Sequence, residues 1–171
     1  LPISGRKADA LVFPSSTQDK KKNPLPATNK VDYLEIMFPP ASSPVQIMNP
    51  AETGIRTPFE AIAFLKGAGY SDIHFVVGSD RVPEFRGMLE KYHPDVEVIS
   101  GGQRNMNSNA ANITGMSATK VRDAVLRGNW DTFRKGIHPS IKGEAYEDLF
   151  RKIQYGLEAV GAANTKSKRT G

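Results

Sequence analysis

Short apolar runs alternate with longer segments of helical periodicity along most of this chain. The apolar runs are four to six residues long and end at Pro, Ser, Asn or Gly, which is typical of buried strands; they cover residues 8–13, 45–48, 73–77 and 96–99. The helical segments cover residues 30–38, 58–66, 83–92, 118–128, 130–135 and 143–157. This alternation predicts an α/β fold, with a mostly parallel, Rossmann-like sheet flanked by helices.

Polar segments follow three of the predicted strands. They are residues 14–22, residues 78–80, and the Asn-rich loop of residues 101–114. In a parallel sheet, ligands bind beyond the carboxyl ends of the strands. We therefore expect these three segments to meet at one rim of the sheet.

Composition narrows the class of protein. The chain has 171 residues, of which 39% are apolar and 24% charged, which predicts one domain over residues 1–160. Residues 161–171 have no apolar periodicity and supply three of the five net positive charges, so they are predicted to be a disordered basic tail. The absence of Cys excludes disulfides and thiolate metal sites, and no apolar run is long enough for a membrane span.

The octet Gly-Met-Ser-Ala-Thr-Lys-Val-Arg, at residues 115–122, is the most informative stretch. Ser117 is a good N-cap, and Thr119, Lys120 and Arg122 follow in the first turns, where the helix dipole favours an anion. The octet is either a cradle for phosphate or an ordinary capped helix with solvated basic residues. Lys20–Lys22 is likewise either a solvated loop or a phosphate contact.

Three stretches in this order resemble the nucleotidyltransferase superfamily of the cytidylyltransferase and nicotinamide-mononucleotide adenylyltransferase type. Residues 115–122 are similar to its Ile-Ser-x-Thr-x-x-Arg signature, and residues 76–81 to its nucleotide-contacting turn. Residues 13–25 look like the loop after the second strand in the cytidylyltransferase-like proteins of large tailed bacteriophages. The likeness to these phage proteins is the strongest.

The resemblance implies a role for each matching residue. It implies catalytic roles for Lys21 and Arg122, and nucleotide contacts from Gly78, Ser79, Asp80, Met116, Ser117, Thr119 and Arg122. Ser117, Thr119 and Arg122 would hold the β and γ phosphates, and Gly78 and Asp80 would lie near the ribose or base. It also implies Mg²⁺ as cofactor, with a nucleoside triphosphate and a phosphorylated small molecule as substrates.

The chain departs from the family in its histidines. The family carries His-x-Gly-His on a first strand, and neither that strand nor that spacing is present here. His74 falls inside a predicted strand and is expected to be a packed core residue, whereas His93 and His138 precede prolines and are expected in loops. We therefore expect either that further residues precede Leu1 in the natural protein, or that the domain has lost its catalytic activity.

Two functions follow from this reading. The first is a nucleotidyltransferase that moves a nucleoside monophosphate from a triphosphate to a phosphorylated acceptor and releases pyrophosphate, in the cytoplasm of an infected bacterial host if phage-encoded. The alternative is a catalytically retired fold acting as a structural or interaction module with a protein partner, for example in a phage particle. Nucleic-acid binding is disfavoured, because the basic residues are not interleaved with aromatic ones.

Overall fold

The structure is a computed structural model that describes residues 8–102 and 116–169, with side chains described as far as residue 158. The chain divides into two compact units. Unit 1 comprises Leu1–Asp9 and Ile55–Gly115, and unit 2 comprises Ala10–Gly54 and Met116–Gly171. The single domain expected over residues 1–160 stays a prediction.

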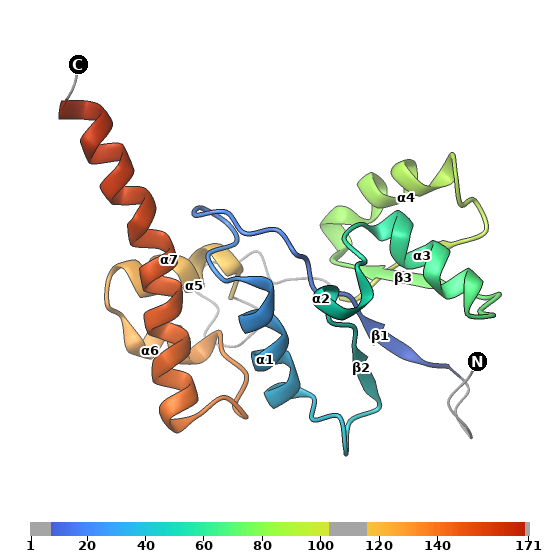
Figure 1. The fold of residues 1–171 in the computed structure, drawn as a ribbon, viewed down its shortest axis with the longest axis horizontal. Coiled ribbons are helices and arrows are strands. Elements are labelled where there is room, and N and C mark those ends of the chain that lie inside the picture. The colour runs from blue at the N-terminus through green and yellow to red at the C-terminus, as the bar shows by residue number, and fades with distance from the viewer. Residues whose placement is uncertain (1–7, 103–115, 170–171) are drawn as a thin grey trace. The chain divides into compact units, whose positions relative to one another are not determined.

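Unit 1 contains one pair of parallel strands with helices around it (Figure 1). Its elements in chain order are α3 (Pro58–Gly67), β3 (His74–Val77), the short helix η1 (Ser79–Arg81), α4 (Val82–Glu90) and β4 (Glu97–Ser100). His74 pairs with Glu97 and Val77 with Ser100. The apolar core of this unit is formed by Ile62, Ile73, Leu89, Val96 and Val98.

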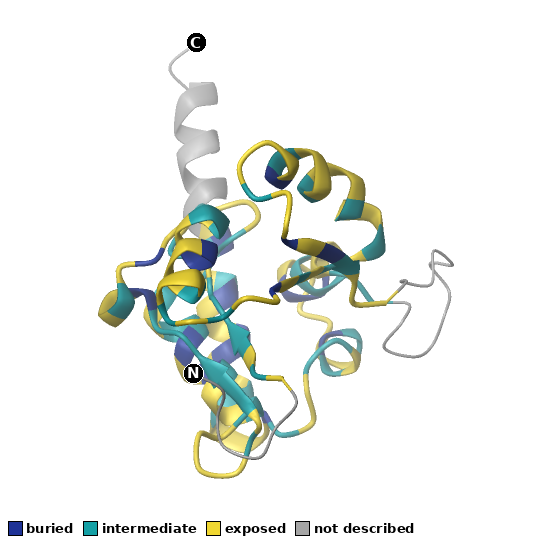
Figure 2. Cartoon of the chain, turned by 90° about the vertical axis from the view of Figure 1, so that its right-hand side faces the viewer, coloured by how far each residue is buried: buried dark blue, intermediate teal, exposed yellow. Residues whose placement is uncertain are grey.

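Unit 2 also contains one pair of parallel strands, and most of the helices. Its elements are β1 (Ala10–Val12), α1 (Ala27–Met37), β2 (Val45–Ile47), α2 (Pro50–Thr53), α5 (Ala118–Leu126), α6 (Trp130–Lys135) and α7 (Gly143–Arg169). β1 and β2 are parallel, with Ala10 opposite Val45. Figure 2 shows the buried positions as dark blue segments on the helices and strands of the structure.

An aromatic cluster holds α5, α6 and α7 together. Phe133 is fully buried and meets the ring of Phe150 edge-on, with ring centroids 5.0 Å apart. Trp130 stacks on the ring of Phe150 with the ring centroids 3.7 Å apart, although 39% of the tryptophan stays exposed. Val125 of α5 is fully buried in the same core. Because Val125, Phe133 and Phe150 share one core, α5, α6 and α7 pack together.

The strands and helices predicted from the sequence are confirmed, with small shifts at their ends, and both strand pairs are parallel as expected. Thr57 caps α3 through its Oγ1, which accepts from the backbone N–H of Glu60 at 3.1 Å. The four strands of residues 8–102 form two separate pairs, so one continuous Rossmann-like sheet stays a prediction. The sequence analysis missed the single-turn helix α2, because Asn49-Pro50 was interpreted only as the end of a strand; Asn49 in fact caps that helix.

Helix α7 is longer than predicted. It runs to Arg169, whereas the apolar periodicity predicted an end near Leu157. The disorder expected over residues 161–171 stays a prediction. The physical reason is that helix propensity does not need an apolar face. Ala, Lys and Arg are strong helix formers, and no proline occurs after Gly143 to end the helix.

His74 corrects a second expectation. The side chain is 45% exposed rather than packed in a core, and its Nε2 lies 3.0 Å from Asp72 Oδ1 and 3.6 Å from Glu97 Oε2. The residues of β3 alternate between exposed and half-buried, and His74 falls on the exposed side. The strand pattern therefore predicted the backbone pairing of His74 correctly, but it did not show which face of the strand is buried.

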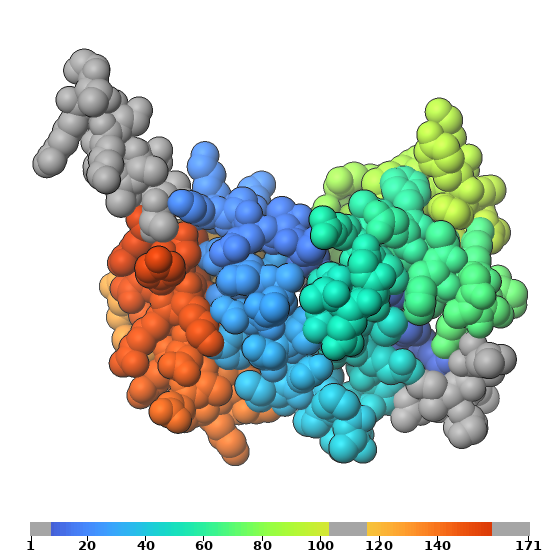
Figure 3. All heavy atoms as spheres, viewed as in Figure 1, coloured from blue at the N-terminus to red at the C-terminus, as the bar shows by residue number. Residues whose placement is uncertain are grey.

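Helix α7 and the loop before α1 approach each other closely at Gly156. A Cβ built on Gly156 would lie 2.4 Å from the carbonyl oxygen of Pro24 and 2.8 Å from its Cβ. Figure 3 shows the blue atoms of this early part of the chain lying against the red atoms of α7. Since most of the contact is with backbone, a side chain at position 156 has no room unless the loop moves.

Gly156→Ala is therefore expected to destabilise the protein, while Gly87→Ala is its matched control. Gly87 lies inside α4, and a Cβ there meets nothing within 4 Å. Alanine should gain about 0.5–1 kcal/mol of stability at Gly87 from helix propensity. At Gly156 the collision with Pro24 should outweigh that gain. Urea unfolding of both variants measures the difference, and equal stabilisation by both would contradict the close packing.

Candidate functional site

Helix α5 begins with a capped turn. Ser117 is the N-cap in an extended conformation, and its Oγ accepts from the backbone N–H of Lys120 at 3.2 Å. This satisfies one of the donors that a helix N-terminus leaves open. Thr119 is exposed, and Lys120 and Arg122 are half-buried, all within the first turns. The predicted cap and its polar surroundings are confirmed.

The three consecutive lysines lie on a turn that Asp19 organises. Its Oδ1 accepts from the backbone N–H groups of Lys21 at 2.9 Å and Lys22 at 2.7 Å, and its Oδ2 accepts from the Asn23 side chain at 2.7 Å. The backbones of Asp19 and Asn23 also pair at 3.0 Å. The Asp19 carboxylate thus holds the turn together through three hydrogen bonds. The side chains of Lys20–Lys22 are exposed.

Arg122 joins this lysine turn to the start of α5. Its Nη1 donates to the carbonyl oxygen of Lys22 at 3.3 Å, across 100 residues of sequence. Its Nη2 donates to Oγ1 of Thr119 at 3.2 Å. We call this group the α5 cradle: Ser117, Thr119, Arg122 and the turn of residues 19–23. It joins part of the first predicted rim segment, residues 14–22, to the start of α5.

Lys30 anchors the loop that leads into the lysine turn. Its Nζ donates to the carbonyl oxygens of Ser15 at 3.2 Å and Thr17 at 2.8 Å, and to Oγ of Ser15 at 2.9 Å. Desolvation by the surrounding chain lowers the pKa of Lys30. The loop is therefore held at both ends, by Lys30 near its start and by the contact of Pro24 with Gly156 at its end.

The cradle concentrates positive charge. Among the ion pairs of the described residues, none involves Arg122 or Lys20–Lys22. The Arg122 guanidinium bonds a carbonyl and a hydroxyl oxygen, neither of which carries a full negative charge. Asp19 is the acid of the turn, and its oxygens accept from three N–H donors there. An anion is the ligand that this balance of charge favours.

Three of the other predicted nucleotide contacts belong to unit 1. Gly78 is the N-cap of η1, and Ser79 and Asp80 are the first two residues of that short helix. Asp80 folds back over Gly78, since its Oδ1 lies 2.9 Å from the point where a Cβ of Gly78 would stand. Met116 lies in unit 2, with its Cε 3.1 Å from the corresponding point of Gly136, so its side chain packs toward the end of α6. The loop of residues 103–115 lies outside the described residues.

The side chains of the cradle do not supply the ligands with which a protein holds a Mg²⁺ ion. Mg²⁺ prefers carboxylate oxygens, together with water and phosphate. The cradle offers ammonium, guanidinium, hydroxyl and N–H groups, and the Asp19 oxygens are already engaged. Within the part of the chain that the structure describes, no group of three His, Asp or Glu side chains is arranged to hold a metal ion.

Three residues that shape this site were not predicted from the sequence: Asp19, Lys30 and Gly156. Asp four residues before Asn in a lysine-rich loop is typical of a side-chain-stabilised turn, which was a usable signal for Asp19. An isolated glycine inside a helical pattern indicates close packing, which was a signal for Gly156. Nothing local indicated Lys30, because its three acceptors lie 13 to 15 residues away.

Comparison of the chain with protein-family models, with curated proteins and with solved structures finds no significant match in any of the three. Among the helices of the described residues, none has the length and apolar content that crossing a membrane requires.

Acid should loosen the lysine turn through Asp19. Hydrogen bonds from the Asn23 side chain and from the backbone N–H groups of Lys22 and Lys21 hold the pKa of Asp19 well below its usual range. A lowered pKa in the folded state gives stability above the unfolded value of about 3.9, and this stability declines as the pH falls toward the folded value. Asp19→Asn should therefore be less stable than the wild type at pH 7, by a margin that shrinks below about pH 4.

Urea unfolding of both proteins at pH 7 and at pH 3 measures this margin. Asp32→Asn is the control at pH 7, since Asp32 is exposed on α1 in the same unit, and it should change stability little. A margin that stays constant down to pH 3 would show that the Asp19 carboxylate does not organise the turn.

Proposed function

We propose that the chain is a nucleotidyltransferase that binds the triphosphate of a nucleotide in the α5 cradle. The observation that supports this most is the double contact of Arg122, which joins the lysine turn to the capped start of α5. A helix N-terminus, two hydroxyls, an arginine and exposed lysines supply the donors that a triphosphate takes up. The resemblance of residues 115–122 to the nucleotidyltransferase signature supports the same assignment.

In the proposed reaction, a phosphate oxygen of the acceptor bonds to the α-phosphorus of the triphosphate. The bond between the α-phosphorus and the bridging oxygen breaks, and pyrophosphate leaves with that oxygen. The cradle would hold the β and γ phosphates, which become the leaving pyrophosphate. Arg122 and Lys21 would stabilise the negative charge that grows there, and positioning of this kind is the main source of catalysis in phosphoryl chemistry.

Ser117 and Thr119 have different tasks in this proposal. The Ser117 hydroxyl already accepts from Lys120 N–H, and its hydrogen is available to donate to a phosphate oxygen. Thr119 receives a hydrogen bond from Arg122, which orients the guanidinium toward the lysine turn. Thr119 is thus a positioning residue for Arg122 as well as a phosphate contact.

Arg122→Ala should weaken binding of ATP or CTP, whichever the wild type binds, by about 10- to 150-fold, which is the range for hydrogen bonds to charged groups. Arg127→Ala is the matched control, because Arg127 is exposed at the other end of α5 and should leave affinity unchanged. Isothermal titration calorimetry of the full chain gives the affinities, and urea unfolding checks that both variants fold.

Failure of the folded wild type to bind either triphosphate would overturn the proposal. Equal affinities of Arg122→Ala and wild type would also overturn it, because Arg122 is the group that holds the cradle together. Binding of the triphosphate without release of pyrophosphate from it when phosphorylated acceptors are added would favour the alternative, a catalytically inactive fold that serves as an interaction module.

A further inference from the structure

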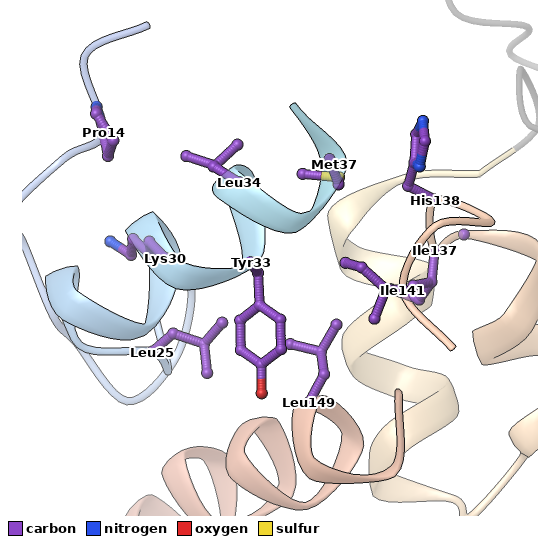
Figure 4. A pocket seen from close by; sticks show the side chains of 11 residues that line it. Pro14, Leu25, Lys30, Tyr33, Leu34, Met37, Ile137, His138, Ile141 and Leu149 are labelled. Atoms are coloured by element: carbon purple, nitrogen blue, oxygen red, sulfur yellow. The ribbon is translucent and has the colours of Figure 1, made fainter. Parts of the chain in front are cut away.

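Unit 2 contains an apolar pocket that the proposed function does not use. It has a volume of about 370 Å³ and lies between α1, the segment of residues 136–141 and the start of α7. Aliphatic and aromatic side chains form most of its wall (Figure 4), among them Tyr33, Leu34, Met37, Ile137, Ile141 and Leu149. Its volume falls within the range of small-molecule sites, about 300–1,000 Å³.

The carbon chain of Lys30 lines this pocket, whereas its charged ammonium group is hydrogen-bonded to the neighbouring loop. Its ammonium is bonded to Ser15 and Thr17 of the neighbouring loop. A lysine held in this way contributes methylene groups to an apolar wall. Desolvation lowers the pKa of Lys30, as expected for an amine in a sheltered position. The wall is therefore apolar without an unsatisfied charge.

His138 supplies a hydrogen-bond donor at the edge of the pocket, beside Met37 (Figure 4). Its Nδ1 accepts from the backbone N–H of Ser140 at 3.2 Å, and the Ser140 hydroxyl lies 2.6 Å from the same atom. Because a backbone N–H can only donate, the hydrogen of the neutral ring lies on Nε2. Both hydrogen bonds of the His138 ring to described residues are at Nδ1, so the Nε2 donor is available to a ligand.

The pocket is built on the same segments as the α5 cradle but on different residues. Gly136 lines the pocket, and a Cβ on it would lie 2.5 Å from Cγ2 of Val121 in α5. The loop that carries the lysine turn contributes Pro14 and Leu25 to the pocket wall. A ligand here would occupy a site of its own, next to elements that also carry the cradle.

We propose that this pocket binds a small molecule with an apolar, ring-containing body and one hydrogen-bond-accepting group, which pairs with Nε2 of His138. The apolar walls of α1, residues 136–141 and α7 hold the body by burying its surface. One polar donor at the edge fixes its orientation. This site does not depend on triphosphate binding by the cradle.

The probe for this test is 1-anilinonaphthalene-8-sulfonate, which combines aromatic rings with a sulfonate acceptor and fluoresces in apolar sites. Titration of the full chain should show saturable binding of one molecule per chain. Leu34→Glu places a carboxylate in the pocket wall and should weaken binding at least tenfold, because burial of an unpaired charge is costly. Ile36→Glu is the matched control, since Ile36 lies on α1, is 36% exposed and does not line the pocket.

His138→Phe tests the polar contact. It keeps a ring and removes the donor, so binding should weaken by about two- to tenfold, the value of one hydrogen bond. Since His138 is exposed, this variant decides the question even if Leu34→Glu fails to fold. Absence of saturable binding to the wild type, or equal affinities of the wild type and both pocket variants, would overturn the proposal. Triphosphate affinity should be unchanged in His138→Phe, so this result is distinct from failure of the cradle.

Discussion

The position of the lysine turn depends on how closely the chain approaches α7 at Gly156. Pro24 lies where the side chain of any other residue at position 156 would stand, and this contact fixes the end of the loop before α1 begins. Lys30 fixes the beginning of the loop through Ser15 and Thr17. Arg122 then reaches the carbonyl oxygen of Lys22 from α5. The cradle exists because three contacts of different kinds hold one loop in one place.

In unit 2 apolar packing provides the stability, whereas the charged side chains favour binding of an anion. The buried rings of Phe133 and Phe150 lock α5, α6 and α7, and burial of such side chains is the dominant source of stability. The cationic side chains of the cradle, Arg122 and Lys20–Lys22, contribute little to stability, because they have no acidic partners among the described ion pairs. Several positive charges kept near one another without neutralisation are expected where an anion binds.

Unit 1 uses its charges differently. Lys66 and Asp95 form an ion pair at 2.9 Å, and the hydrogen bond from Lys66 lowers the pKa of Asp95. His74 lies beside Asp72 and Glu97. In this unit Lys66 and His74 lie beside acids, whereas in the cradle the Arg122 guanidinium bonds a carbonyl and a hydroxyl oxygen. The contrast supports the cradle as the place where an anionic ligand compensates the charge.

Local signals explain what the sequence predicted well. Ser117, and Thr57 followed by Pro58, marked the starts of two helices, because capping depends on residues within one turn. Burial of His74 was predicted wrongly, because a strand has two faces and its own sequence does not say which one is covered. The residue that Gly156 contacts, the acceptors of Lys30 and the partner of Arg122 could not be predicted locally, since each lies far away in the sequence.

The most direct test of the cradle is an NMR titration of the full chain with inorganic tripolyphosphate, following backbone amide signals. If the lysine turn and the start of α5 form one site, the amides of Lys21, Lys22, Thr119 and Lys120 should shift together and give one dissociation constant. The amide of Arg127, at the far end of α5, should stay in place. Shifts in only one of the two segments, or different dissociation constants for them, would contradict a shared anion site.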